Sequence, residues 1–67
     1  MATATMTHAR KAGMCSRGMR QFAEERNLDW DDFLQNGIST EQLRSLDDEM
    51  ANQVAGIAEE EASNGQG

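Results

Sequence analysis

The chain has 67 residues, which is enough for one compact domain and too few for two. A single cysteine, Cys15, excludes an internal disulfide, and no apolar run approaches the roughly 20 residues of a membrane-spanning helix. Residues 1–14 lack the apolar stretch of a signal peptide, so we expect a cytoplasmic protein. Twelve acidic and six basic residues give a net charge of −6, which disfavours nucleic acid as a direct partner.

The first predicted helix follows an irregular N-terminal segment. Residues 1–14 show no sustained apolar period, and we expect them to be mobile. From about residue 16 to 26, apolar side chains recur every three or four positions, which predicts a helix with one apolar stripe. This helix should end at Asn27, a residue type that tolerates the left-handed conformation, with Leu28 folding back on the last turn.

Two capping signals define the next helices. Asp29 should cap a helix over residues 30–36 by accepting a hydrogen bond from the backbone amide of Asp32. Gly37 should end that helix with a positive φ. Ser39 should then cap a further helix that begins at residue 40.

The last predicted helix, over residues 40–60, contains the acidic run that begins at Asp47. Because Asp caps helices better than it continues them, two arrangements stay open: one continuous helix, or a short helix over 40–45 and a longer one from about residue 48. The chain has no proline and no strict apolar alternation, so we expect no strand. The predicted fold is all-α, a bundle of three helices over residues 15–60, or four with the break, before a disordered tail at 61–67.

The candidate core is small. Twelve large apolar residues are available to it: Met19, Phe22, Leu28, Trp30, Phe33, Leu34, Ile38, Leu43, Leu46, Met50, Val54 and Ile57. Burying each is worth roughly 1.5–3 kcal/mol, against roughly 1.5 kcal/mol of ordering entropy for every residue. We therefore expect a partner surface or a homo-oligomer to add stability.

Catalysis is not predicted. One histidine, His8, and the distant Cys15 are too few for a zinc site or a Cys/His catalytic pair, so no metal is expected. The acidic clusters lack the spacing of a calcium loop, and the sequence contains neither a P-loop nor a dinucleotide fingerprint, so no cofactor is expected. A short chain also offers little room for a pocket that would shift carboxylate pKa values.

The charges are distributed unevenly along the chain. Residues 1–26 hold five of the six basic residues, and residues 27–67 hold ten acidic residues beside Arg44. One interpretation is a solvated acidic surface, and the other is an acidic face that attracts a basic partner. For the second, the candidate partner-binding residues are Trp30, Asp31, Asp32, Asp47, Asp48 and Glu49. Arg44 stands alone among acids in the segment that would enter a DNA groove, which argues against a helix-turn-helix.

Three runs of sequence carry a resemblance: Cys15-Ser16-Arg17-Gly18-Met19-Arg20-Gln21-Phe22, the run from Asn27 through Leu43, and Asp48-Glu49-Met50-Ala51. Together they resemble small uncharacterised proteins of tailed bacteriophages and prophages. Leu46-Asp47 stands where the resemblance implies a small residue and a glycine. The resemblance implies a phage origin, and it brings no catalytic or ligand residues with it.

Two functions fit these observations. The first is a non-catalytic protein-binding module, a virion structural or assembly accessory protein that docks on other phage proteins in the host cytoplasm or in the virion. The alternative is an acidic inhibitor of a host defence or nucleic-acid-binding protein, of the anti-CRISPR or DNA-mimic type. The acidic residues are shared between several predicted helices rather than lined up on one, which favours the first.

Overall fold

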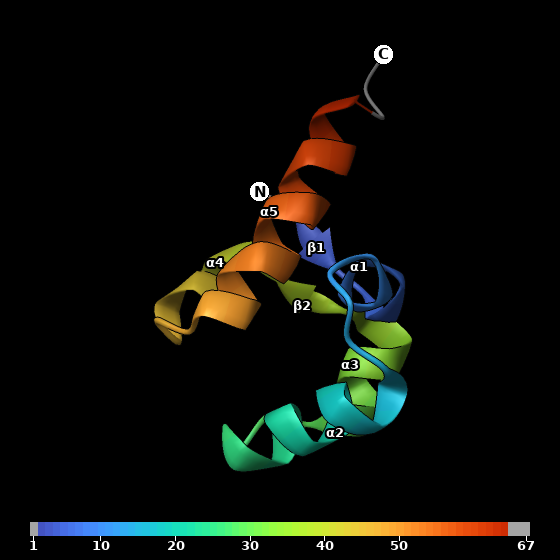
Figure 1. Cartoon of the computed structure of the whole chain (residues 1–67), viewed down its shortest axis with the longest axis vertical. Helices are drawn as coiled ribbons and strands as arrows, with labels where there is room; N and C mark the ends of the chain where they lie inside the picture. Colours follow the sequence, from blue (N-terminus) through green and yellow to red (C-terminus); the bar gives the residue numbers. More distant parts are fainter. Residues whose placement is uncertain (1, 65–67) are drawn as a thin grey trace.

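The computed structural model describes residues 2–64, within which five helices surround a two-stranded sheet. In chain order the elements are β1 (Thr3–Ala4), α1 (Met6–Lys11), α2 (Ser16–Glu25), α3 (Trp30–Asn36), β2 (Ile38–Ser39), α4 (Thr40–Ser45) and α5 (Glu49–Asn64) (Figure 1). The chain is therefore mostly helical, as expected. The all-α prediction requires one correction, because the sequence analysis excluded strands and the structure contains a pair of them.

The two strands pair antiparallel and bring the N-terminal segment onto the middle of the chain. Thr3 lies opposite Ser39 and Ala4 opposite Ile38, and the backbone N–H of Thr40 donates to the carbonyl of Ala2 at 2.9 Å. The sequence predicts a mobile segment over residues 1–14, whereas the structure places β1 and α1 within residues 2–14. Ala2, Ala4 and Ala9 of this segment are buried, and Ala4 is fully buried. Because alanine side chains are small, they contribute little to an apolar pattern in the sequence.

Helix α1 is fixed at its start and along one side. The backbone N–H of Thr5 donates to Nδ1 of His8 at 2.9 Å, which satisfies one of the free amides at a helix start. Nε2 of His8 lies 3.3 Å from a carboxylate oxygen of Glu61 on α5, and Lys11 pairs with the same carboxylate. The only histidine thus joins α1 to α5.

The junction between α2 and α3 has the predicted geometry. Asn27 has a φ of 59°, and the N–H of Leu28 donates to the carbonyl of Ala23 at 2.7 Å, as in a Schellman ending. Oδ1 of Asp29 accepts from the N–H of Asp32 at 3.1 Å and caps α3. Both predicted helices are confirmed, with α3 at the predicted bounds.

The junction between α3 and α4 is also confirmed. Gly37 has a φ of 77°, and Oγ of Ser39 accepts from the N–H of Gln42 at 3.1 Å. Between them, Ile38 turns into the core as part of β2. Gly37 also lies directly against β1, a contact that the sequence did not predict.

The last helical segment is divided, which decides between the two arrangements left open. Helix α4 ends at Ser45, and Asp47 adopts a left-handed φ of 53° between the two helices. Oδ1 of Asp48 then accepts from the backbone N–H groups of Met50 and Ala51 at 2.9 and 3.1 Å, so it caps α5. A disordered tail is predicted over residues 61–67, but α5 continues through residues 61–64. Residues 65–67 lie outside the described residues.

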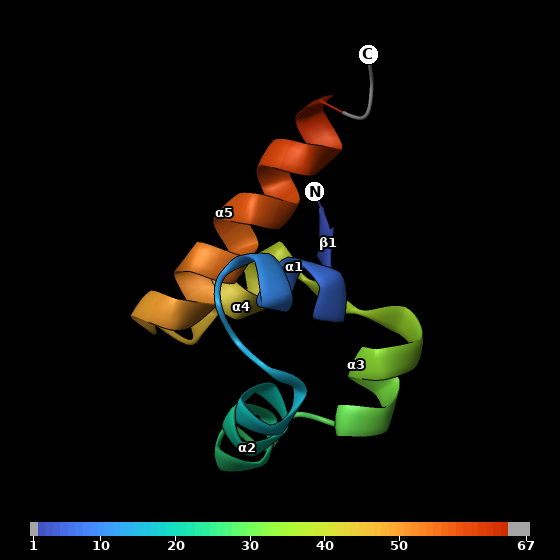
Figure 2. The ribbon, with the colours of Figure 1, turned by 45° about the vertical axis from the view of Figure 1, so that its right-hand side comes forward.

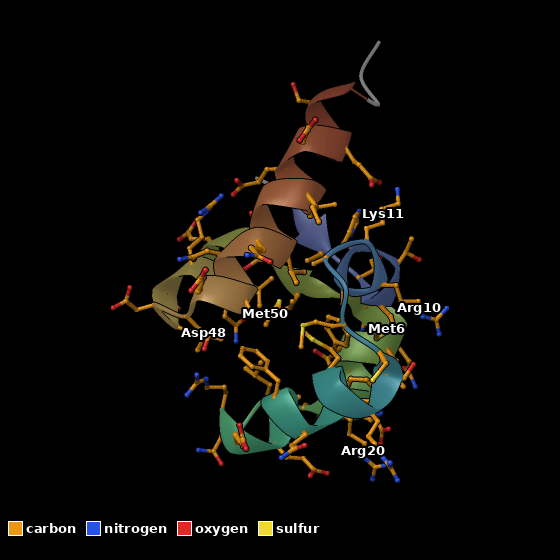
Figure 3. The ribbon with its side chains drawn as sticks, in the orientation of Figure 1. Met6, Arg10, Lys11, Arg20, Asp48 and Met50 are labelled. Carbon is orange, nitrogen blue, oxygen red and sulfur yellow. The ribbon has the colours of Figure 1, made fainter. Side chains whose placement is uncertain are left out.

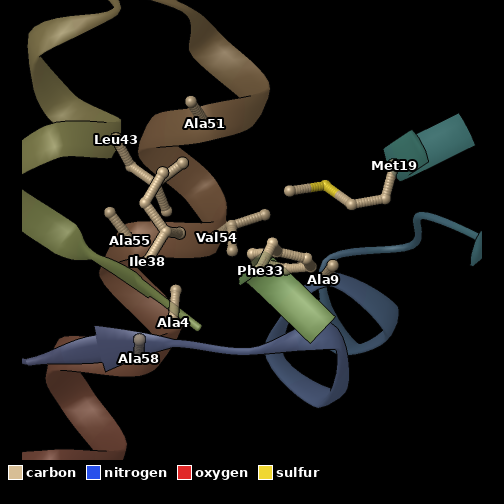
Figure 4. Close-up of a cluster of buried hydrophobic side chains, with 10 residues drawn as sticks. All are labelled: Ala4, Ala9, Met19, Phe33, Ile38, Leu43, Ala51, Val54, Ala55 and Ala58. Atoms are coloured by element: carbon tan, nitrogen blue, oxygen red, sulfur yellow. The ribbon is translucent and has the colours of Figure 1, made fainter. Parts of the chain in front are cut away.

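Small side chains make up half of the core. Ala51, Val54, Ala55 and Ala58 form the buried stripe of α5, on which the remaining members of the cluster pack (Figure 4). Those members are Ala4, Ala9, Met19, Phe33, Ile38 and Leu43. Two predicted core residues are instead exposed, Leu34 at 51% and Met50 at 36% of their surface.

Helix α5 is the longest element and organises the molecule. It contacts α4, α1 and β1. Helix α2 lies at the end of the molecule away from the last turns of α5, in both Figure 1 and Figure 2. Met19 and Ala23 of α2 are each 1% exposed, and Met19 belongs to the core cluster, so buried side chains hold the outlying helix against the rest of the fold.

Candidate binding surfaces

The six candidate partner-binding residues do not form one patch. Asp47, Asp48 and Glu49 lie at the turn between α4 and α5, whereas Asp31 and Asp32 lie in the first turn of α3. Figures 1 and 2 place α3 and this turn on different sides of the molecule. The acidic residues therefore form two separate surfaces.

The turn between α4 and α5, residues 46–50, is called the acidic turn below. Asp47 and Glu49 are exposed, and Met50 beside them is one of the two exposed large hydrophobic residues of the described chain. Oδ2 of Asp48 lies 2.7 Å from a guanidinium nitrogen of Arg26, which also lies 5.3 Å over the ring of Phe22. The turn thus exposes the carboxylates of Asp47 and Glu49 and the thioether of Met50, on a backbone that Arg26 links to α2.

The pKa of Asp48 lies below its ordinary value, because the backbone N–H of Ala51 and the guanidinium of Arg26 favour the ionised carboxylate. The pKa of Glu59 is lowered by its hydrogen bonds with Arg44, and that of Glu61 by Lys11. A group with a lowered folded-state pKa contributes stability above its unfolded pKa of about 4. That contribution is lost as the pH falls through the folded-state value.

These shifts predict how stability depends on pH. The melting temperature should be nearly constant from about pH 7 to pH 5 and should fall below about pH 4.

Asp48→Asn keeps an oxygen that can cap α5 but removes the charge, so it should be less stable than wild type at pH 7. The difference should shrink as the pH falls below about 4, and it should close once the pH lies below the lowered folded-state pKa of Asp48, where the group is protonated in both states. Thermal unfolding of both proteins measures it, and a difference that stays constant with pH would contradict the assigned cause.

Trp30 belongs to another surface. Its ring stacks on Phe33 with centroids 5.7 Å apart. It also lines an open groove of about 670 Å³ between α2 and α3, called the α2–α3 groove below. The other lining residues are Ser16, Arg17, Arg20, Gln21 and Glu24. The sequence groups Trp30 with the acidic candidate residues, whereas in the structure Trp30 lines a groove with Arg17 and Arg20.

A second groove, of about 580 Å³, lies between α4 and the later turns of α5. Arg44 and Glu59 line it and pair through two hydrogen bonds of 3.0 and 2.6 Å. Because these charges already satisfy each other, this groove offers a ligand little that is unpaired.

No three His, Cys, Asp or Glu side chains of residues 2–64 are grouped so that they could hold a metal ion. Cys15 is exposed, and its Sγ accepts from the N–H of Gly18 at 3.4 Å as the cap of α2. In the same part of the chain, no helix is long and apolar enough to cross a membrane.

No known family model, curated protein or solved structure matches the chain. The expected phage origin therefore rests on the sequence resemblance alone.

Proposed function

We propose that this chain is a non-catalytic protein-binding module, a phage virion structural or assembly accessory protein that contacts its partner through the acidic turn. The observation that carries the proposal is Met50, exposed in the same turn as the exposed carboxylates of Asp47 and Glu49. A flexible thioether adapts to apolar pockets, while flanking carboxylates select basic surroundings. The partner surface expected for this turn is an apolar pocket rimmed by Lys or Arg.

The anchoring of the turn supports this function. The cap at Asp48, the Arg26–Asp48 pair and the left-handed Asp47 fix the backbone before a partner arrives. Preorganisation of this kind reduces the entropy lost on binding. The alternative, an acidic inhibitor that mimics nucleic acid, would need carboxylates spaced along one face, and the acids of α3 and of the acidic turn lie apart.

A capture experiment with matched variants tests the proposal. The wild-type chain, Met50→Ala with Asp47→Asn and Glu49→Gln, and a control with Glu25→Gln and Glu60→Gln are immobilised and exposed to lysate of infected cells. The control makes the same change in net charge at exposed acids elsewhere. We expect a phage protein that binds the wild type and the control and is reduced at least tenfold on the turn variant.

Other outcomes discriminate between the functions. Equal capture on all three proteins would refute the acidic turn as the contact surface. Capture of a host nucleic-acid-binding protein that releases its DNA on binding this chain would favour the inhibitor instead. Detection of the chain in purified virions would separate a structural component from a factor that acts only during assembly.

A further inference from the structure

The α2–α3 groove is the described surface on which positive charge is least neutralised. Arg17 and Arg20 lie one helical turn apart on α2, so their guanidinium groups share a face, with Trp30 at the opposite wall. Guanidinium groups bind carboxylates through paired hydrogen bonds, and a tryptophan ring offers an apolar surface beside them. The groove is therefore suited to an acidic segment that carries an apolar side chain.

The pairing of the other cations sets this groove apart. Lys11, Arg26 and Arg44 each pair with a carboxylate on another part of the fold. Arg10 donates to Oγ of Ser16, which lines the groove, at 3.4 Å. Arg20 pairs with Glu24 at 3.3 Å within one helix, and both side chains are more than 60% exposed. Such pairs are worth only a few tenths of a kcal/mol, so Arg20 can exchange its partner at low cost. Arg17 has no carboxylate partner among the described residues.

We propose that this groove receives the acidic turn of a second copy of the chain. In this contact Arg17 and Arg20 bind the carboxylates of Asp47 and Glu49, and Met50 packs against Trp30. A methionine sulfur beside an aromatic ring is a favourable contact. The inference rests on the proposed function, because it uses the same acidic turn and names its partner.

The positions of the two surfaces determine the form of the assembly. Figure 3 shows Asp48 and Met50 at the start of α5 and Arg20 on the far side of α2. One copy therefore cannot bind its own turn. Unless two copies exchange their turns in a closed two-fold dimer, each contact leaves a turn free at one end and a groove free at the other. Repetition of such a head-to-tail contact builds a ring or an open chain.

The net charge of −6 on each copy opposes association without preventing it. At physiological ionic strength the Debye length is about 8 Å, so charges spread over two copies are largely screened from each other. Direct contacts between guanidinium and carboxylate groups lie well within that length and are screened much less.

Two neutralised variants and their mixture test the proposal by sedimentation velocity, over about 10 μM to 1 mM full-length chain. Arg17→Gln with Arg20→Gln removes the charge of the groove, and Asp47→Asn with Glu49→Gln removes that of the turn. We expect the wild type to associate with increasing concentration and each variant to associate at least tenfold more weakly. Circular dichroism verifies that both variants remain helical.

The mixture is the decisive sample. The groove variant keeps a native turn and the turn variant keeps a native groove, so an equimolar mixture should form a 1:1 pair that does not grow further. A control with Lys11→Gln and Arg44→Gln makes the same change in net charge at cations of α1 and α4 that do not line the groove, and it should associate like the wild type.

Several results would overturn the inference. These are a wild type that stays monomeric, neutralised variants that associate like it, or a mixture without the 1:1 pair. Binding of a single-stranded oligonucleotide that depends on Arg17 and Arg20, without self-association, would assign the groove to nucleic acid instead. Loss of self-association with intact capture of a phage protein by the acidic turn would leave the proposed function standing, so the two failures are distinguishable.

Discussion

Gly37→Ala is expected to destabilise the protein by about 3 kcal/mol, which lowers the melting temperature by about 15 °C in a domain of this size. Gly37 has a φ of 77° and a ψ of −170°, a conformation that residues with a Cβ adopt only at a cost. A Cβ atom would also lie 2.6 Å from the carbonyl oxygen of Ala4 and 2.6 Å from Cγ2 of Thr3. The substitution therefore forces β1 away from the junction between α3 and α4.

Gly13→Ala separates the two causes. Gly13 also has a positive φ, 94°, but nothing lies within 4 Å of a Cβ at that position. This substitution should cost only the backbone strain, about 1 kcal/mol. Thermal and chemical unfolding measure both variants. Equal losses at the two glycines would mean that β1 does not pack against Gly37 in solution.

The helix junctions could be predicted because their causes lie within a few residues. The carboxylate of Asp29 reaches the amide three positions later, and Ser39 does the same at the next helix. Asn27 and Gly37 are residue types that accept a positive φ, and both have one. Local chemistry was enough to place these boundaries.

The N-terminal segment could not be predicted because its structure depends on distant contacts. Strand β1 is two residues long and pairs with a strand more than thirty positions away. Its buried residue is Ala4, a small side chain that leaves little apolar signal in the sequence, and the strand packs against α5. A short strand of this kind exists only through tertiary packing, which local propensity does not report.

The candidate site was predicted in part for the same reason. The acidic run at residues 47–49 is continuous in sequence, and the structure keeps it together at one turn. The association of Trp30 with Arg17 and Arg20 depends instead on how α2 packs beside α3, and no periodicity within a single helix predicts it. The basic residues of α2 were noted only as a charge imbalance, although their spacing of three was visible.

Ala9→Asp should destabilise the protein by several kcal/mol, enough to unfold much of a small domain at 25 °C. Ala9 is fully exposed to solvent if residues 1–14 are mobile, and fully buried against α5 in this structure. A carboxylate placed there loses its hydration without gaining a cation, so its pKa must rise. The penalty is present at pH 7 and should shrink towards pH 4 as the introduced acid becomes protonated.

Thr7→Asp is the matched control on the same helix. Thr7 is exposed in the first turn of α1, where a negative charge interacts favourably with the free amides of the helix start. It should leave stability unchanged or raise it by less than about 1 kcal/mol. Unfolding of the two variants at pH 7 and pH 4 therefore tests whether α1 belongs to the core. If the two variants were equally stable, residues 1–14 would be mobile in solution, because the burial of Ala9 is what makes an aspartate there more costly than one at Thr7.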